Sequence, residues 1–261
     1  MKGILGAICG DIIGSVYEFN PIKTKEFQLF QPNSTFTDDT VLTLAIAKWL
    51  CEYNNSEEKL IENLQYYGKL YPNAGYGGRF NQWLNQDNPK PYGSWANGAA
   101  MRVSPCPWAA NSLEESQKLA KQSAIVTHNH PTAITSALAT SDAIYLAKTG
   151  SDKNQIQKHI ETNYGYDLSI SLKKIRPYYS FDVSSQGSVP EAILCFLEGK
   201  NYEDTIRNAI SLGGDADTQA AIAGSIASAY WEIPKKIYYK AIHRLDNRLL
   251  NILIDFEEKF I

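Results

Sequence analysis

Residues 213–231 read GGDADTQAAIAGSIASAYW, and no other part of the chain says as much about its architecture. Two glycines and a D-x-D pair stand where a helix would begin, and residues 218–231 are nearly all small. An Asp at a helix N-terminus accepts hydrogen bonds from free backbone N–H groups and complements the helix dipole. A helix with so little side-chain bulk lets neighbouring backbones approach closely. We therefore predict that residues 218–231 form a central helix inside a bundle of other helices.

Helical patterns continue on the N-terminal side of this stretch and beyond it. Residues 37–50 open with Thr and Asp and continue as an apolar run, and residues 112–127 begin with a capping box. Further helices are predicted over Thr132–Lys148, Ser151–Asn163, Pro190–Glu198, Tyr202–Leu212 and Pro234–Ile261. No segment has the convincing period-2 alternation of a strand. With no composition break that marks a boundary, we predict an all-α protein with one domain over residues 1–261.

Composition excludes several classes of protein. The net charge of −3 comes from interspersed acidic and basic residues, which argues against general electrostatic binding to nucleic acid. A nucleic-acid substrate bound through one modified group stays open. The four cysteines are far apart and form no CxxC pair, which argues against a zinc site or a redox dithiol. No apolar run approaches the roughly 18–20 residues that cross a bilayer. We expect a cytoplasmic protein without membrane binding.

Two acidic clusters stand at predicted helix starts, Thr37-Asp38-Asp39-Thr40 and Asp215-Ala216-Asp217-Thr218. Helix capping explains either cluster alone, because one side chain per helix is enough. Together the four carboxylates exceed what capping requires. If the two helix N-termini face each other, the acids repel one another unless cations bind. Oxygen ligands of this kind suit Mg²⁺, Mn²⁺ or Ca²⁺ rather than zinc, so the pair of clusters indicates a metal site with room for two ions.

Other stretches offer candidate site residues, each with a plainer alternative. Glu18 follows an apolar stretch, and a glutamate in that place is commonly just exposed. Gly75–Gly78 can present backbone N–H groups to a phosphate, although the pattern is not that of a P-loop. Residues 97–102 (NGAAMR) are first small and polar and then apolar. His128 and His130 flank a predicted helix start, where hydrogen bonding or capping explains them without any ligand.

Taken in this order, the motifs resemble the ADP-ribosylglycohydrolase family, which includes the bacterial dinitrogenase-reductase-activating glycohydrolases and the vertebrate ADP-ribosylhydrolases. The motifs are GAICGDIIGSVYE, FTDDT, GYGG, NGAAMR, the pair Thr127-His128 and SLGGDADTQAA, and they span residues 6 to about 231. The resemblance implies a compact orthogonal bundle of helices with a two-metal centre between helix N-termini, holding two divalent cations, Mg²⁺ or Mn²⁺.

The resemblance also implies a role for individual residues, matched position by position. The implied metal ligands are Thr37, Asp38, Asp39, Asp215, Asp217 and Thr218. Glu18 and Asp39 are the implied catalytic acids. The implied substrate-binding residues are Gly75, Tyr76, Gly77, Gly78, Asn97, Gly98, Met101, His128 and, as a weaker match, His130.

The implied activity is hydrolysis of the glycosidic bond between ADP-ribose and a modified protein, nucleic acid or small molecule, by a monomeric enzyme. Such a reaction passes through an oxocarbenium-like transition state, and two metal ions suit it by gripping ribose hydroxyls and positioning a water. Arginine-linked ADP-ribose is the first expectation, with serine-linked, nucleobase-linked and small ADP-ribosyl substrates left open. Two alternatives remain: a metal-dependent phosphohydrolase acting on a nucleotide or pyrophosphate, and a non-catalytic ADP-ribose-binding protein.

Overall fold

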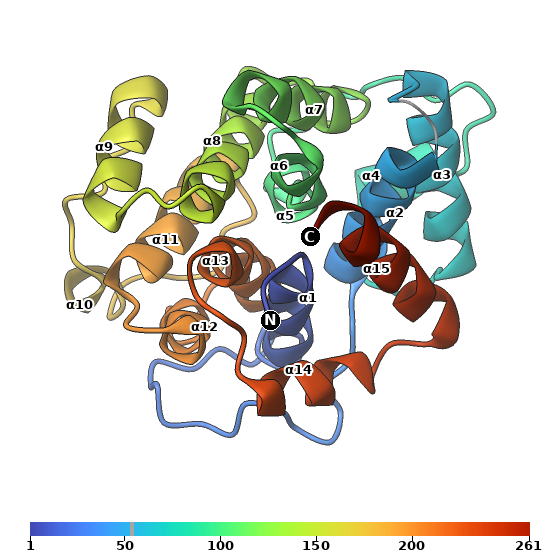
Figure 1. Cartoon of the computed structure of the whole chain (residues 1–261). Coiled ribbons are helices and arrows are strands. Elements are labelled where there is room, and N and C mark those ends of the chain that lie inside the picture. The colour runs from blue at the N-terminus through green and yellow to red at the C-terminus, as the bar shows by residue number, and fades with distance from the viewer. Residues whose placement is uncertain (53–54) are drawn as a thin grey trace.

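Two helices rich in small residues, α1 (Leu5–Gly14) and α13 (Ala216–Tyr230), lie side by side at the centre of the protein (Figure 1). The structure is a computed structural model that describes residues 1–52 and 55–261. A Cβ placed on Gly10 would lie 2.0 Å from the carbonyl oxygen of Ala220, and one on Gly14 would lie 2.5 Å from the Cα of Asp217. These glycines are required because the two backbones are almost in contact.

Residues 216–229 of α13 are all buried, as predicted for the helix of small residues. Helix α1 was not predicted, because all ten of its residues are buried and its sequence is apolar on every side apart from Asp11. A helix that is hydrophobic all round lacks the 3.6-residue periodicity that identifies an amphipathic helix. The central pair is therefore the most buried part of the bundle.

The other helices surround this pair, and the described residues contain no β-strand, only an isolated bridge between Ala96 and Ser184. The helices that pack directly on α1 or α13 are α2 (Asp38–Glu52), α5 (Gly98–Met101), α8 (Pro131–Lys148), α11 (Ser185–Glu198), α12 (Tyr202–Ile210) and α14 (Lys235–Ile242). The outer helices are α3 (Glu57–Leu70), α4 (Gly78–Leu84), α6 (Pro105–Ala109), α7 (Leu113–Ile125), α9 (Lys153–Tyr164), α10 (Leu172–Ile175) and α15 (Asn247–Phe260). The all-α prediction is confirmed.

Side-chain caps account for most of the predicted helix starts and for two errors. Ser112 accepts a hydrogen bond from the Glu115 backbone N–H at 3.1 Å, which is one half of the predicted capping box. The Glu115 carboxylate accepts from the Asn111 N–H at 2.8 Å instead of the Ser112 N–H. Pro190 was predicted to begin a helix but lies inside α11, because Ser184 caps that helix one and a half turns earlier. The predicted helix over 234–261 is two helices, since Asp246 caps a new start at α15 by accepting from the Leu249 N–H at 3.0 Å.

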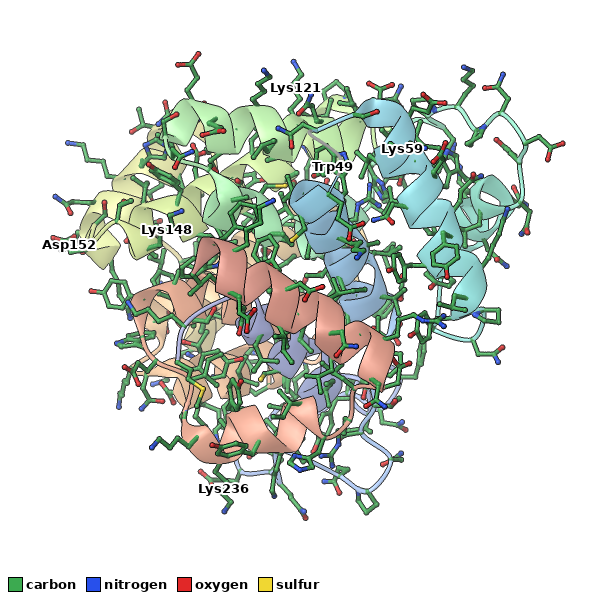
Figure 2. The ribbon with its side chains drawn as sticks, turned by 45° about the vertical axis from the view of Figure 1, so that its right-hand side comes forward. Trp49, Lys59, Lys121, Lys148, Asp152 and Lys236 are labelled. Atoms are coloured by element: carbon green, nitrogen blue, oxygen red, sulfur yellow. The ribbon has the colours of Figure 1, made fainter. Side chains whose placement is uncertain are left out.

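Charged side chains lie on the outside of the bundle, whereas Trp49 of α2 is one of the large side chains packed in its interior. Figure 2 shows Lys121 and Lys236 at the edges of the molecule, where both are exposed. Trp49 is fully buried, and its indole N–H donates to the Ser56 carbonyl at 2.8 Å, so its one polar group is satisfied. Within the described residues, no helix has the length and apolar character needed to cross a membrane.

The contact between α1 and α13 predicts the effect of a single methyl group. Gly10→Ala should lower the free energy of unfolding by about 3 kcal/mol, because the added Cβ meets backbone atoms of Ala220 that cannot move aside alone. Urea denaturation measures the change. Gly77→Ala is the control, since a Cβ on Gly77 meets nothing within 4 Å and should change stability by no more than about 0.5 kcal/mol. Equal effects of the two substitutions would contradict the tight packing of α1.

Candidate active site

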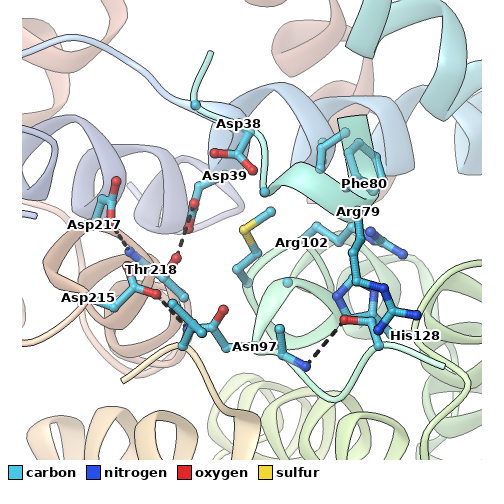
Figure 3. A pocket seen from close by; sticks show the side chains of 18 of the residues that line it. Asp38, Asp39, Arg79, Phe80, Asn97, Arg102, His128, Asp215, Asp217 and Thr218 are labelled. Atoms are coloured by element: carbon cyan, nitrogen blue, oxygen red, sulfur yellow. Dashed lines mark hydrogen bonds between the residues drawn. The ribbon is translucent and has the colours of Figure 1, made fainter. Parts of the chain in front are cut away.

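The N-terminal ends of α2 and α13 meet at a pocket of about 330 Å³ (Figure 3). Asp38 and Asp39 come from α2, and Asp215 and Asp217 from the start of α13. All four line the pocket together with Thr218, whose hydroxyl donates to Asp39 Oδ2 at 3.2 Å. The fold therefore brings together two clusters that are 179 residues apart in sequence.

Glu18 joins the same acidic cluster from a turn that follows α1. One oxygen atom from each of Glu18, Asp215 and Asp217 lies within 4.8 Å of the others. Glu18 is half-buried and lines the pocket, whereas both aspartates are almost fully buried. Glu18 is therefore not the exposed surface residue that the sequence left open as an alternative.

Burial and mutual repulsion keep these carboxyl groups from ionising easily. Burial, followed by the charges of neighbouring acids, raises the pKa of Asp38 to about 8 and that of Glu18 to about 7. The same two causes raise the pKa of Asp39 and Asp217 well above the ordinary range. Within the described residues, no Lys, Arg or His forms an ion pair with any of these carboxylates. When these groups ionise, no cationic side chain of the described residues pairs with them.

The residues present fit divalent cations. The candidate ligands offer only carboxylate and hydroxyl oxygens, which hard ions such as Mg²⁺ and Mn²⁺ prefer. Asp39 Oδ1 is buried and has no hydrogen-bond partner among the described residues, an arrangement that is costly unless a cation binds there. Asp215, the residue at the N-cap of α13, makes no capping hydrogen bond. Helix capping, the simpler explanation, thus leaves these groups unexplained.

Asp11 is one of the residues whose role the sequence did not predict. It is fully buried on α1, and its Oδ2 atom accepts from the backbone N–H of Thr37 at 3.0 Å and of Thr40 at 3.1 Å. The Thr40 hydroxyl also donates to Oδ2, and the Thr37 hydroxyl donates to Oδ1 at 2.7 Å. Asp11 therefore caps α2 from another helix, so Asp38 and Asp39 are not needed as caps. The signal was present in the sequence as one acid inside an apolar run.

Thr37 was expected to be a metal ligand and does not line the pocket. Its hydroxyl proton is used in the hydrogen bond to Asp11, while the oxygen keeps lone pairs and accepts from the Asp39 N–H at 3.3 Å. The structure thus places Thr37 directly behind the acids of α2.

Glycines and cationic side chains make up much of the rest of the pocket lining. The expected residues Gly75, Gly77, Gly78, Asn97, Gly98, Met101 and His128 all line the pocket. Two of them lie beside the acids, because a Cβ on Gly75 would be 3.5 Å from Asp38 Oδ1 and Asn97 donates to Asp215. Arg79 and Arg102 also line it and were not expected. In Figure 3 the aspartates lie on one side of the pocket and Arg79, Arg102 and His128 on the other. A ligand that spans the pocket thus meets acidic groups at one end and positive charge at the other.

Two expected substrate-binding residues lie outside the pocket lining. Tyr76 packs on Phe80, which itself lines the pocket, with ring centroids 5.5 Å apart. His130 is exposed at the N-cap of α8, where its Nδ1 atom accepts from the Thr132 N–H at 3.3 Å. The capping role that the sequence left open for the histidines is therefore what His130 performs. Asn97, by contrast, reaches the acidic cluster and donates from Nδ2 to Asp215 Oδ2 at 2.7 Å.

The raised pKa values predict how stability depends on pH without metal. Asp38 has a pKa of about 8 in the fold and an ordinary value of 3.8, so the folded state binds more protons between these limits. Stability is therefore greatest at low pH and is lost as pH rises through the folded pKa. In the presence of EDTA, the melting temperature should rise as pH falls from about 8 to about 6, because in this range Asp38 is protonated in the folded state and ionised in the unfolded state.

Two variants isolate this effect. Asp38→Asn should flatten the pH dependence because one titrating carboxyl is gone. Asp167→Asn should leave it unchanged, since Asp167 is exposed and its pKa is lowered, outside this range. A melting temperature that falls on acidification to pH 6 in the wild type would contradict the raised pKa values.

Comparison with known proteins agrees with this arrangement. The family model described as ADP-ribosylglycohydrolase matches residues 1–257. The chain is 28% identical to ADP-ribosylhydrolase ARH3 of Mus musculus and 29% identical to that of Homo sapiens. Each alignment covers 87% of this chain, and covers 82% of the mouse and 84% of the human protein.

A solved structure extends the likeness to the fold. A chain from an ADP-ribosylglycohydrolase-related protein complex superposes with a TM-score of 0.75 at 22% identity, over 99% of this chain and 96% of that one. At this identity the likeness shows the fold alone. The family model matches nearly the whole chain. The fold is a helical bundle, and its carboxylates lie together at the N-terminal ends of α2 and α13. This chain belongs to the ADP-ribosylglycohydrolase family and is a glycohydrolase that acts on ADP-ribose linkages.

Proposed function

We propose that the protein uses two divalent cations to hydrolyse the glycosidic bond between ADP-ribose and a modified target, releasing intact ADP-ribose. The observation that carries the proposal is the polarity of the pocket, with five carboxyl groups at one end and two arginines at the other. Ribose hydroxyls and a metal centre suit the acidic end, and the pyrophosphate of ADP-ribose suits the cationic end.

The residues that would hold the ions are the aspartates of α2 and α13 with Thr218, and Thr37 stands behind them as a further oxygen donor. Bound there, Mg²⁺ or Mn²⁺ would orient the ribose through its hydroxyls and lower the pKa of a water. Asn97 supports this set because its Nδ2–H group holds the Asp215 carboxylate in one orientation. With a defined orientation, the carboxylate is preorganised instead of having to reorient on binding.

Glu18 is the proton-transfer group of the proposal. Cleavage breaks the bond between the anomeric carbon and the leaving group, which keeps the bonding electron pair, and a water oxygen forms the new bond to that carbon. A carboxylate oxygen of Glu18, at the pocket surface beside Asp215 and Asp217, would accept the proton that the water loses and pass it on to the leaving group. Asp39 is the second candidate for this role, but it is 3% exposed and holds the Thr218 hydroxyl. Its position favours holding an ion.

The identity of the target is the open part of the proposal. The expectation of an arginine linkage came from resemblance to the bacterial members of the family, whereas the relatives reported above are ARH3 proteins. We therefore no longer place the arginine linkage first. Phe19, the residue after Glu18, and Phe181 are exposed aromatic side chains outside the pocket lining, with ring centroids 6.1 Å apart.

A release assay tests the activity. Substrates with ADP-ribose linked to arginine, serine, a nucleobase or a small molecule should yield intact ADP-ribose in at least one case. EDTA should abolish the release, and added Mg²⁺ or Mn²⁺ should restore it, because the site has only oxygen ligands. Release of AMP or phosphate would instead identify a phosphohydrolase, and binding of ADP-ribose without turnover on the whole panel would identify a binding protein. Full activity after metal-free dialysis with excess EDTA would rule out the metal mechanism.

Substitution of Glu18 tests the proton transfer. Glu18→Gln should reduce turnover by about 10²–10⁴-fold while ADP-ribose binds with nearly unchanged affinity, because the amide keeps the shape and loses the basicity. Calorimetric titration of ADP-ribose beside the release assay separates the two effects.

Glu191→Gln is the matched control for this substitution. Burial raises the pKa of Glu191 to about 7, as it does for Glu18, but Glu191 does not line the pocket. Its replacement should leave turnover within about twofold of the wild type, in line with the small effect of changes away from a site. A wild-type rate for Glu18→Gln would remove Glu18 from the mechanism.

A further inference from the structure

His128 presents one ring nitrogen to the protein and the other to the pocket. The side chain is almost fully buried and lines the cationic end. Its Nδ1 atom lies 2.7 Å from the hydroxyl of Thr127. Its Nε2 atom faces Gly98, where a Cβ would lie only 3.0 Å away. Nε2 makes no hydrogen bond to any part of the chain that the structure describes, so the partner it needs must come from the pocket.

Arg102 lies directly behind this pair. It is fully buried, and its Nη2 group donates to the Thr127 hydroxyl at 2.7 Å and to the Ser123 carbonyl at 2.8 Å (Figure 3 shows Arg102 and His128). Among the described residues it has no ion-pair partner, and its Nε and Nη1 groups have no hydrogen-bond partner. Burial of a guanidinium without a carboxylate partner is energetically costly. We therefore expect Arg102 to act through the residues that it contacts.

The chemistry of the two neighbours decides which atom donates. A guanidinium can only donate, so Thr127 Oγ1 accepts from Arg102. The hydroxyl has one proton of its own, and within the described chain its remaining partner is His128 Nδ1. If Nδ1 were protonated, it would also donate to Oγ1, and the buried hydroxyl proton would have no acceptor, at an energetic cost. The hydroxyl therefore donates to Nδ1, and the ring proton is on Nε2.

We propose that Arg102 and Thr127 are positioning residues that fix neutral His128 as the Nε2–H tautomer, so that His128 donates a hydrogen bond to an anionic oxygen of the bound ligand. Arg102 points the Thr127 hydroxyl at Nδ1, and Thr127 in turn orients the imidazole. The ligand class, a nucleoside diphosphate group such as that of ADP-ribose, rests on the proposed function. The tautomer does not, because it follows from contacts within the free protein.

The electrostatic surroundings agree with a neutral ring. Burial and the positive charges of Arg102 and Arg79 lower the pKa of His128 well below its ordinary value. The pKa of Arg102 falls only to about 10, so the positive charge near neutral pH stays on the arginine. Arg102 therefore carries the positive charge behind the pocket wall, while neutral His128 is the hydrogen-bond donor that faces the ligand.

Nitrogen NMR of the histidine rings tests the tautomer directly. The full-length protein, labelled with ¹⁵N at its four histidines, is measured without ADP-ribose. The spectrum of His128, assigned by its loss in His128→Gln, should show an unprotonated Nδ1 and a protonated Nε2. A protonated Nδ1 in the wild type would overturn the proposal.

Two substitutions at Thr127 test the relay. Thr127→Val has the same shape without the hydroxyl, so His128 should lose its single tautomer and calorimetric affinity for ADP-ribose should fall by roughly tenfold. Thr127→Ser restores the hydroxyl and should restore both the tautomer and the affinity, which a general packing effect would not do. If Thr127→Val keeps the wild-type tautomer and affinity, the relay does not exist. If the wild type shows the expected tautomer but does not bind ADP-ribose, the proposed function fails and the relay stands.

Discussion

The near-contact between α1 and α13 is the constraint on which the rest of the structure depends. Gly10 and Gly14 allow the two backbones to touch, and that contact sets the position of Asp217, the last acid of the second cluster. The same helix α1 carries Asp11, which holds Thr37 and Thr40 at the start of α2. One helix thereby fixes both acidic clusters relative to each other. A shift of α1 along α13 would therefore move the two acidic clusters relative to each other.

Asp11 takes over the capping of α2 that Asp38 and Asp39 would otherwise provide. The first turn of a helix has backbone N–H groups that need acceptors, and the nearest side chains usually supply them. Here the acceptor comes from a different helix, so Asp38 and Asp39 keep their oxygens for the pocket. This arrangement costs a buried carboxylate, and Asp11 is accordingly surrounded by four donors.

Each end of the pocket holds buried ionisable groups of one sign that have no partner of the opposite sign among the described residues. The acidic end gathers carboxyl groups whose pKa values are raised because they repel one another in a buried place. The cationic end has Arg102, a buried guanidinium without an acid to pair with. The two ends do not neutralise each other, because the pocket separates them. Cations at one end and a diphosphate at the other would relieve both, so the same features that weaken the empty fold favour the bound one.

Local patterns in the sequence were enough for the helices and for the acids at their starts. Caps and apolar periodicity act within a few residues, so they predicted α7, α8 and the small-residue helix α13 with its two aspartates. Helix α1 was missed because a segment buried on all sides has no polar face and so no periodicity. Resemblance to a family, and not the residues alone, singled out Glu18 from other glutamates.

Tertiary packing was needed wherever a residue acts over a long distance in sequence. Asp11 meets Thr37 from 26 residues away, and Arg102 meets Thr127 from 25 residues away, and neither pairing leaves a mark on local periodicity. His128 and His130 are two residues apart and similar in sequence context, yet one lines the pocket and the other caps α8 in solvent. Local propensity determines which segments are helical, because helix hydrogen bonds are short-range. The packing of those helices determines which side chains meet, because that depends on how their backbones approach in space.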